Sequence, residues 1–289
     1  FEQLLLFTSG GLFWIVYYNL RAELGRWLDK IVIALGIVFG GLFITNYFWG
    51  ETQIRPWSLF LPYTGYLNHN NIGDLWSVVL TISVFYTIQK PRIYRYWILA
   101  ILGVYFLIMS QSRTALVSLA VGLYYLAKNF GWTARYKKVF LAFGILVGTL
   151  FLYFGSQKSV LQSRQYYVQA LVGLVNNPFG VGVGNFGLIS TDPANWIFGL
   201  SHTSIVVHNI VLEIMAGMGI FGVVFVIWLI KVLLKLWNKE EKQTLVYRAS
   251  FFALLTNFLF HSTYFVPSML WLWMMLLGIS QAGSTKVRV

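Results

Sequence analysis

A run of polar residues near position 70 has side chains suited to binding sugars. Asn68-His69-Asn70-Asn71 stand together, and Asp74 follows where an apolar segment begins. Amides, an imidazole and a carboxylate can together donate to and accept from sugar hydroxyls. The same residues also suit a helix start, because Asn caps helix N-termini. We keep His69, Asn71 and Asp74 as candidate substrate-binding residues, with capping as the alternative.

Two arginines have the chemistry to bind phosphate. Arg113 lies in the turn Ser110–Thr114, and Arg164 lies in a segment, Leu161–Asn176, that has a helical apolar period. A planar guanidinium can grip two phosphate oxygens at once. The alternative for both is an arginine that anchors a span or snorkels at a membrane interface. Arg164 shares its expected helix face with an apolar stripe made of Leu161, Val168, Leu171, Val172 and Val175.

His208 is the candidate general base. It stands with Asn209 directly before a long apolar segment, and an unperturbed imidazole titrates near pH 6.5. A structural histidine is the alternative. Glu213 follows five residues later, about 140° around a helix, so we do not expect it to orient His208 from the same face. His202, Asn209 and Glu213 are further candidate substrate-binding residues.

The glycines at 182–187 match the spacing G-x-G-x-x-G of dinucleotide-binding loops. That motif requires a preceding strand within a βαβ unit, whereas the flanks here have the composition of membrane helices. We interpret these glycines as a flexible loop or as a site of close backbone packing.

The elements that must position these residues are apolar helices. The chain is 58% hydrophobic and 10% charged, with a mean hydropathy of +0.68. A soluble domain carries about 25% charged residues. The composition predicts an all-α, polytopic transmembrane helical bundle of about nine spans. We expect these near Leu4–Leu20, Ile31–Trp49, Ile72–Ile88, Tyr96–Ser110, Thr114–Ala127, Val139–Phe154, Asn209–Ile230, Ser250–Phe265 and Val266–Ile279.

The distribution of charge predicts the topology. The loops at 21–30, 89–95, 128–138 and 231–248 and the C-terminal tail hold 17 of the 21 lysines and arginines. By the positive-inside rule these segments are cytoplasmic. The alternate loops, and with them the candidate site, would then face outward. The net charge of +12 is therefore a topology signal, and no nucleic-acid partner is expected.

We expect one membrane domain over 1–289, with an outer-face loop region at 155–208 that contains an amphipathic helix. The chain starts at Phe1 without a methionine, which is typical of a fragment that lacks N-terminal spans. Cysteine is absent, which excludes disulfides and thiolate chemistry.

The order of several short motifs resembles the O-antigen ligase and O-antigen polymerase superfamily of bacterial membrane glycosyltransferases. The residues that carry the resemblance are Ser112-Arg113-Thr114, Arg164 with Ala170-Leu171, Asn177-Pro178-Phe179-Gly180-Val181-Gly182, His208-Asn209, Leu212-Glu213 and Gly217-Met218-Gly219. The resemblance covers most of the chain. It does not separate ligase from polymerase, because both use the same chemistry and the large outer loop holds only Lys158 and Arg164 as basic residues.

The resemblance implies an inverting, metal-independent glycosyltransferase without a cofactor, in the bacterial cytoplasmic (inner) membrane with its site on the periplasmic face. Its partners would be the lipid bilayer, a glycan linked to undecaprenyl pyrophosphate, and an acceptor glycan or lipid A core. His208 would deprotonate the acceptor hydroxyl, and Arg113 and Arg164 would bind the donor pyrophosphate.

Two other classes remain open at this stage. A transporter of lipid-linked glycans or of a small anion would place ionisable residues and broken helices near the membrane midplane. A structural subunit of an envelope-synthesis complex would tolerate replacement of Arg113, Arg164 and His208.

Overall fold

The structure is a computed structural model, and it describes residues 2–48, 69–131, 138, 144–145, 148–149, 165–196, 204–239, 241–242 and 244–281. At 2–4, 21–26, 43–48 and 69 only the backbone is described. Over these residues every regular element is a helix, so the predicted all-α class is confirmed.

The helices follow the apolar segments of the sequence. The expected span Val139–Phe154 falls almost wholly outside the described residues. The elements are α1 (Glu2–Asn19), α2 (Arg21–Phe48), α3 (His69–Gln89), α4 (Tyr94–Ser110), α5 (Arg113–Asn129), α8 (Gln165–Asn176), α9 (Phe186–Thr191), η2 (Pro193–Asn195), α10 (Ile210–Met218), α11 (Ile220–Trp237), α12 (Leu245–Phe260), η3 (Ser262–Phe265) and α13 (Pro267–Gln281).

Two of the described helices are long and apolar enough to cross a membrane. They are Asn70–Gln89 within α3 and the whole of α11, whereas the apolar helices α4 and α12 are shorter. A hydrocarbon layer of ~30 Å needs about 20 apolar residues in a helix. The predicted nine-span bundle is therefore not confirmed. Of the two candidates, α3 is 78% buried among other helices and α11 only 17%.

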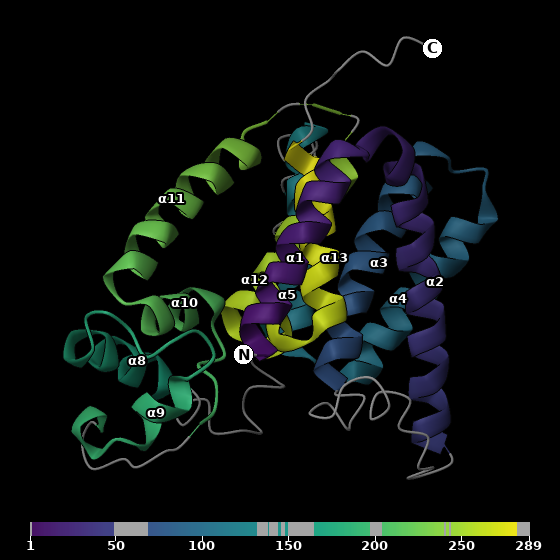
Figure 1. Cartoon of the computed structure of the whole chain (residues 1–289). Coiled ribbons are helices and arrows are strands. Elements are labelled where there is room, and N and C mark those ends of the chain that lie inside the picture. The colour runs from purple at the N-terminus through teal and green to yellow at the C-terminus, as the bar shows by residue number, and fades with distance from the viewer. Residues whose placement is uncertain are drawn as a thin grey trace.

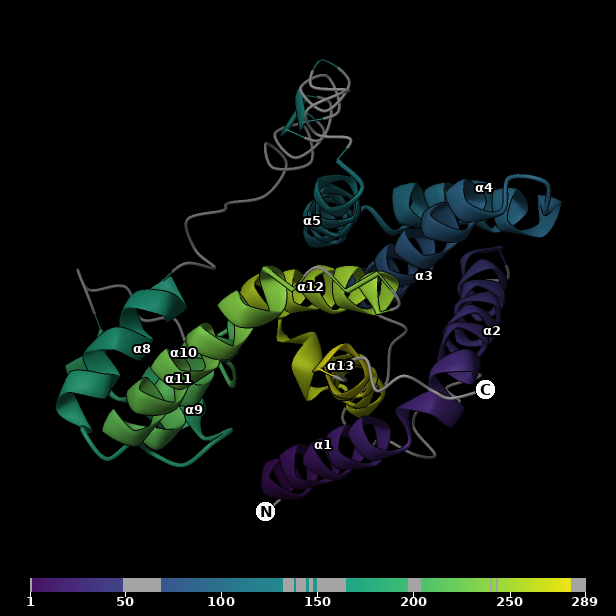
Figure 2. The same cartoon turned by 90° about the horizontal axis from the view of Figure 1, so that it is seen from above.

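The main bundle is built around α3 and α12, which are flanked by α4 and α5 on one side and by α13 and α1 on the other (Figures 1 and 2). The stacked rings of Trp76 and Phe106, 4.7 Å apart, join α3 to α4. Gly122 lets α5 approach both central helices, because a Cβ there would lie 2.8 Å from Thr81 Oγ1 and 3.2 Å from Ala253 Cβ. Small residues thus set the spacing of the bundle.

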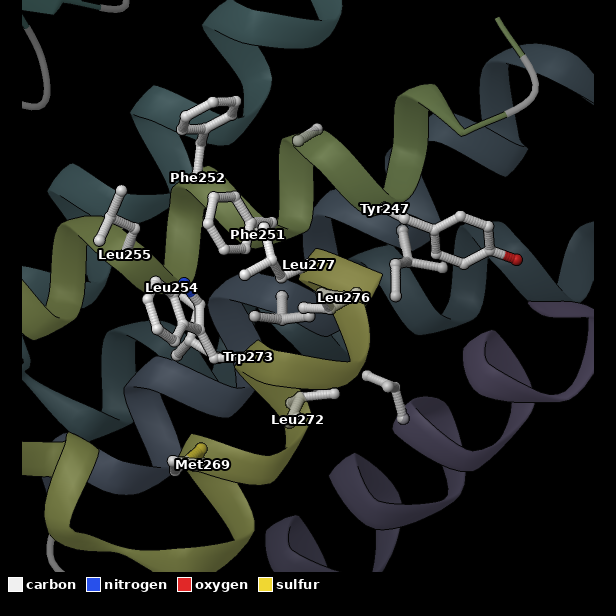
Figure 3. Packing of buried hydrophobic residues seen from close by; sticks show 14 of the residues in the cluster. Tyr247, Phe251, Phe252, Leu254, Leu255, Met269, Leu272, Trp273, Leu276 and Leu277 are labelled. Carbon is white, nitrogen blue, oxygen red and sulfur yellow. The ribbon is translucent and has the colours of Figure 1, made fainter. Parts of the chain in front are cut away.

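Aromatic side chains fill the contact between α12 and α13 (Figure 3). The ring of Trp273 stacks on Phe251 at 5.1 Å and meets the edge of Phe258 at 5.5 Å. All three side chains are buried. Offset and edge-to-face pairs of this kind contribute about 0.5–1.5 kcal/mol each beyond their area. This contact holds the end of α12 in place, where it leads into His261.

The predicted single span Asn209–Ile230 is wrong in one respect, because two helices occupy it. The chain breaks at Gly219, whose backbone has φ 59° and ψ −136°. Residues with a side chain rarely adopt these backbone angles, which are essentially restricted to glycine. In Figure 1, α10 and α11 run in different directions from this break. With 9 residues α10 is too short to span a membrane, so the candidate span here is α11.

The turns rich in basic residues lie together at one end of the bundle, which we call the basic end. There the end of α3 meets the start of α4 through the stacked rings of Tyr86 and Tyr96, and Lys128 of α5 lies over the ring of Trp237 in α11. The Lys239 ammonium donates to the carbonyl of Gln281 at the end of α13 (3.4 Å). The shared location agrees with the grouping of these loops in the charge pattern.

The predicted loop 231–248 is helical at both ends, since α11 runs to Trp237 and α12 begins at Leu245. Arg248 lies inside α12 and is fully buried, where its guanidinium donates to Thr244 Oγ1 (3.2 Å) and to the carbonyl of Glu241. A buried arginine is retained where its donors find oxygen acceptors. Arg248 therefore closes the turn between α11 and α12.

Candidate functional site

The opposite end of the bundle carries the sequence motifs, and we call it the polar end. It is the end at which α3 begins, α4 ends, α5 begins and α12 ends. The first two motifs meet there at Gly73, because a Cβ on that residue would lie 2.8 Å from both Ser110 Oγ and Ser112 Cβ. The polar start of α3 and the turn that holds Arg113 are thus in direct contact.

Arg113 is the first residue of α5, and the turn before it has a defined conformation. Gln111 is left-handed (φ 49°), and Ser112 caps the helix by accepting the N–H of Ala115 at 3.3 Å. Ser112 Oγ also lies 3.0 Å from Thr114 Oγ1. Arg113 as a whole residue is half-buried. The helix N-terminus adds partial positive charge at the same place, so this corner favours an anion.

Asp74 lies one turn below Asn70 in α3 and is fully buried beside Thr263 of η3. The hydroxyl of Thr263 faces its carboxyl, but the two are outside hydrogen-bond geometry. Neither carboxyl oxygen has a hydrogen-bond partner among the described residues. Asn71 is half-buried near the helix start, and the side chain of His69 is outside the described part of the chain. Asp74 is therefore too deep to meet a surface sugar in this conformation.

His208 lies at the polar end, in the short segment that leads into α10. Its backbone is left-handed (φ 60°), which is uncommon for a residue other than glycine, and its carbonyl accepts the Tyr167 hydroxyl at 3.4 Å. The imidazole lies between two rings, with centroid distances of 5.8 Å to Tyr166 and 5.9 Å to His261. Burial lowers the pKa of His208 below its ordinary value, so the ring is neutral at pH 7.

Asn209 holds the start of α10 in place. Its side-chain oxygen accepts the N–H groups of Val211 (2.9 Å) and Leu212 (3.0 Å), and its amide donates to the carbonyl of Leu259 in α12 (2.8 Å). Its side chain is thus used within the protein, as a cap and as a link between two helices. Asn209 therefore has a structural role, and its predicted contact with substrate stays a prediction.

Glu213 orients the His208 segment through the backbone. Its side chain is 1% exposed, and the N–H of Val207 donates to its Oε2 at 3.0 Å. Burial raises the pKa of Glu213 to about 7, partly offset by the backbone N–H groups of Val207 and Gly184 and by the nearby Tyr264 hydroxyl, which itself is outside hydrogen-bond geometry. As expected, Glu213 does not contact the His208 ring; it acts on the preceding peptide.

The glycine-rich loop packs its backbone against the break between α10 and α11. The N–H of Gly182 donates to the carbonyl of Gly217 (2.8 Å), and the N–H of Ile220 donates to that of Pro178 (2.8 Å). A Cβ on Gly180 or Gly219 would overlap the facing backbone. Of the two interpretations, close backbone packing is confirmed, and the loop has no adjoining strand over the described residues.

Helix α8 covers the described part of the predicted Leu161–Asn176 helix. The described helix begins at Gln165, so the expected Leu161–Asn176 helix is supported only from there, and Arg164 and His202 lie outside the described residues. The inward face is made of Tyr166, Gln169, Ala170 and Gly173. The predicted apolar stripe points away from the protein, since Val168, Leu171 and Val175 are exposed.

His261 is a site residue that the sequence interpretation missed, and Asn70 belonged to the predicted polar run but was not kept as a candidate by itself. His261 ends α12 and its Nε2 lies 3.0 Å from Asn70 Nδ2, across 191 positions of sequence. His261 thus links the start of α3 to His208. One signal was present: His261-Ser262-Thr263 interrupts the apolar run 250–279 on the same predicted side as His208.

Within the described residues, no group of three or more histidines and carboxylates has the arrangement of a metal site. No protein-family model, curated protein or solved structure matches this chain.

Proposed function

We propose that this chain is a polytopic glycosyltransferase of the O-antigen ligase or O-antigen polymerase type. It would act at the outer face of the bacterial cytoplasmic membrane, with about nine spans. The observation that carries the proposal is the meeting of His208, the Arg113 turn and the polar start of α3 at one end of the bundle, away from the basic turns. Under the positive-inside rule that end faces outward.

In the proposed reaction, His208 takes the proton of an acceptor hydroxyl. The hydroxyl oxygen forms a bond to the anomeric carbon of the donor sugar as the bond from that carbon to undecaprenyl pyrophosphate breaks. The leaving pyrophosphate keeps the electron pair, and the configuration inverts. A neutral His208 suits this step, because burial lowers its pKa.

Arg113 would stabilise the charge that develops on the pyrophosphate. Two features of its position support this role: it is half-buried, and it starts a helix whose first N–H groups point toward the same region. Arg164 would assist from the position directly before α8. Tyr166, two positions after Arg164, contacts the ring of His208. Positively charged donors that are already in place stabilise a leaving group without reorganisation.

A transporter is the second candidate, and one observation favours it. Asp74 is buried in α3, and neither of its carboxyl oxygens has a hydrogen-bond partner among the described residues. Asn257 Oδ1 in α12 is likewise buried without a hydrogen-bond partner there. Ionisable residues inside membrane helices often mark ion or substrate pathways. A transporter would move the donor or an anion without releasing undecaprenyl pyrophosphate.

The test follows release of undecaprenyl pyrophosphate by the protein in nanodiscs, with a lipid-linked glycan and candidate acceptors. We expect His208→Ala to abolish release while donor binding persists. Arg113→Lys should reduce release about tenfold, because lysine cannot make the bidentate contact with phosphate. Arg92→Lys at the exposed basic end is the matched control and should match wild type. Equal release from wild type and His208→Ala would reject the proposal.

A further inference from the structure

The candidate site contains a second imidazole close to the first. The ring centroids of His208 and His261 are 5.9 Å apart, with 53° between the ring planes. The rings come from different elements, the segment before α10 and the end of α12, and Asn209 ties these together through Leu259. Two protonated imidazoles at this separation would repel strongly in a water-poor site.

The contact with Asn70 determines which nitrogen of His261 carries its proton. The Asn70 amide nitrogen, 3.0 Å from Nε2, has only hydrogens to offer, so Nε2 is the acceptor. The proton of the neutral His261 ring then resides on Nδ1. Protonation of Nε2 would place two donors against each other and break the hydrogen bond. Asn70 therefore favours the neutral form of His261.

The other titratable groups around the pair come from five elements. Tyr166 and Tyr167 of α8 contact the ring and the carbonyl of His208, and Glu213 of α10 holds the neighbouring peptide. Tyr264 of η3 faces Glu213, and Asp74 of α3 lies one turn below Asn70. Arg113 begins α5 beside this start of α3.

We propose that Asn70 and His261 are positioning residues that keep the second imidazole neutral, so that His208 alone takes the acceptor proton. The proposal rests on the proposed function for its role in catalysis, but the pairing of the two rings stands independently of the reaction. Because His261 is held neutral, the proton that arrives on His208 meets no like charge beside it. His208 gives that proton to solvent before the next turnover.

The test is a titration of the imidazoles by nuclear magnetic resonance in ¹³C-histidine-labelled protein in nanodiscs. The chain has 4 histidines, so each signal can be assigned by replacing one histidine at a time with glutamine. In wild type, we expect the His208 signal to titrate at a pH below the ordinary value for histidine and the His261 signal to stay constant over the same range. A His261 signal that titrates together with His208 would overturn the proposal without the use of any variant.

Two substitutions at Asn70 test the mechanism, one with an added charge and one without. Asn70→Asp replaces the donor by an acceptor, so His261 should become protonated and the titration of His208 should move to lower pH. Asn70→Leu removes the donor without adding charge, so the His261 signal should begin to titrate. Tyr166→Phe is the control: it keeps the ring contact with His208 and should leave both titrations unchanged.

Activity separates this proposal from the proposed function. With Asn70→Asp, release of undecaprenyl pyrophosphate should fall about tenfold at its plateau, because a base with a lower pKa is weaker, and its acid limb should move to lower pH. Titrations as expected with no release from any protein would reject the function and keep the histidine pair. Release from wild type together with a His261 signal that titrates with that of His208 would reject the pair and keep the function.

Discussion

Glu213 links the shape of the candidate site to pH. Its carboxyl is buried, and Oε2 accepts the N–H of Val207 beside His208. Burial raises its pKa from 4.5 to about 7. Between those values the folded protein holds a proton that the unfolded chain has released. The stability of the segment that contains His208 therefore falls as pH rises through that window.

The size of the effect follows from the change in pKa. A rise of the Glu213 pKa from 4.5 to about 7 lowers the free energy of unfolding above pH 7 by about 3 kcal/mol. The reference is a side chain at the same position that never ionises. Glu213→Gln is such a group, and its amide oxygen still accepts the Val207 N–H. The variant should match wild type below pH 4.5 and be more stable by up to about 3 kcal/mol above pH 7.

Hydrogen exchange of residues 204–213, followed by mass spectrometry in nanodiscs, measures this local stability. Protection is compared at several pH values after correction for the intrinsic exchange rate. Wild type should lose protection as pH rises to 7, whereas Glu213→Gln should not. Asp192→Asn changes an exposed carboxyl in the loop region 155–208 and should behave as wild type. Parallel curves for wild type and Glu213→Gln would refute the reasoning.

Two further predictions concern the backbone packing and the topology. Gly219→Ala would force a Cβ into the backbone at Pro178 and into a strained conformation, at a cost of about 1–3 kcal/mol or more. Gly11→Ala is the control: its Cβ would have no atom within 4 Å, so it should stabilise α1 by about 0.5–1 kcal/mol. Thermal unfolding compares the two variants. Equal melting temperatures would contradict the proposed packing at Gly219. A cysteine placed at Asp192 of this cysteine-free chain should react with an impermeant reagent from outside, and one at Arg92 should not. The reverse labelling would place the candidate site in the cytoplasm.

Much of the helical content was predictable from the sequence. Runs of apolar residues between polar turns produced α1, α3, α4, α5 and α13 close to the expected bounds. This works because a helix satisfies its own backbone hydrogen bonds, so a local apolar run is sufficient to indicate it. The capping at Ser112 and Asn209 is local in the same sense, since each side chain bonds N–H groups two or three residues away.

The interruptions of helices were less predictable. The apolar run from Asn209 to Ile230 contains no proline and was read as one span, yet it breaks at Gly219. The break depends on the loop Pro178–Gly182, whose backbone needs the space that a side chain at Gly180 or Gly219 would fill. Arg248 was similarly read as a loop residue, because its acceptors are supplied by the turn that folds back over α12.

The sequence by itself determined the all-α class, the separation of basic from polar turns, and the candidacy of His208 and Arg113. Only the tertiary structure decided that Asn70, His208 and His261 belong to one site. Their contacts join residues as far apart as 191 positions, and they form only when the starts of α3 and α10 and the end of α12 lie at the same place. Helix periodicity is a local property, whereas the pairing of helix ends follows from how their side chains pack.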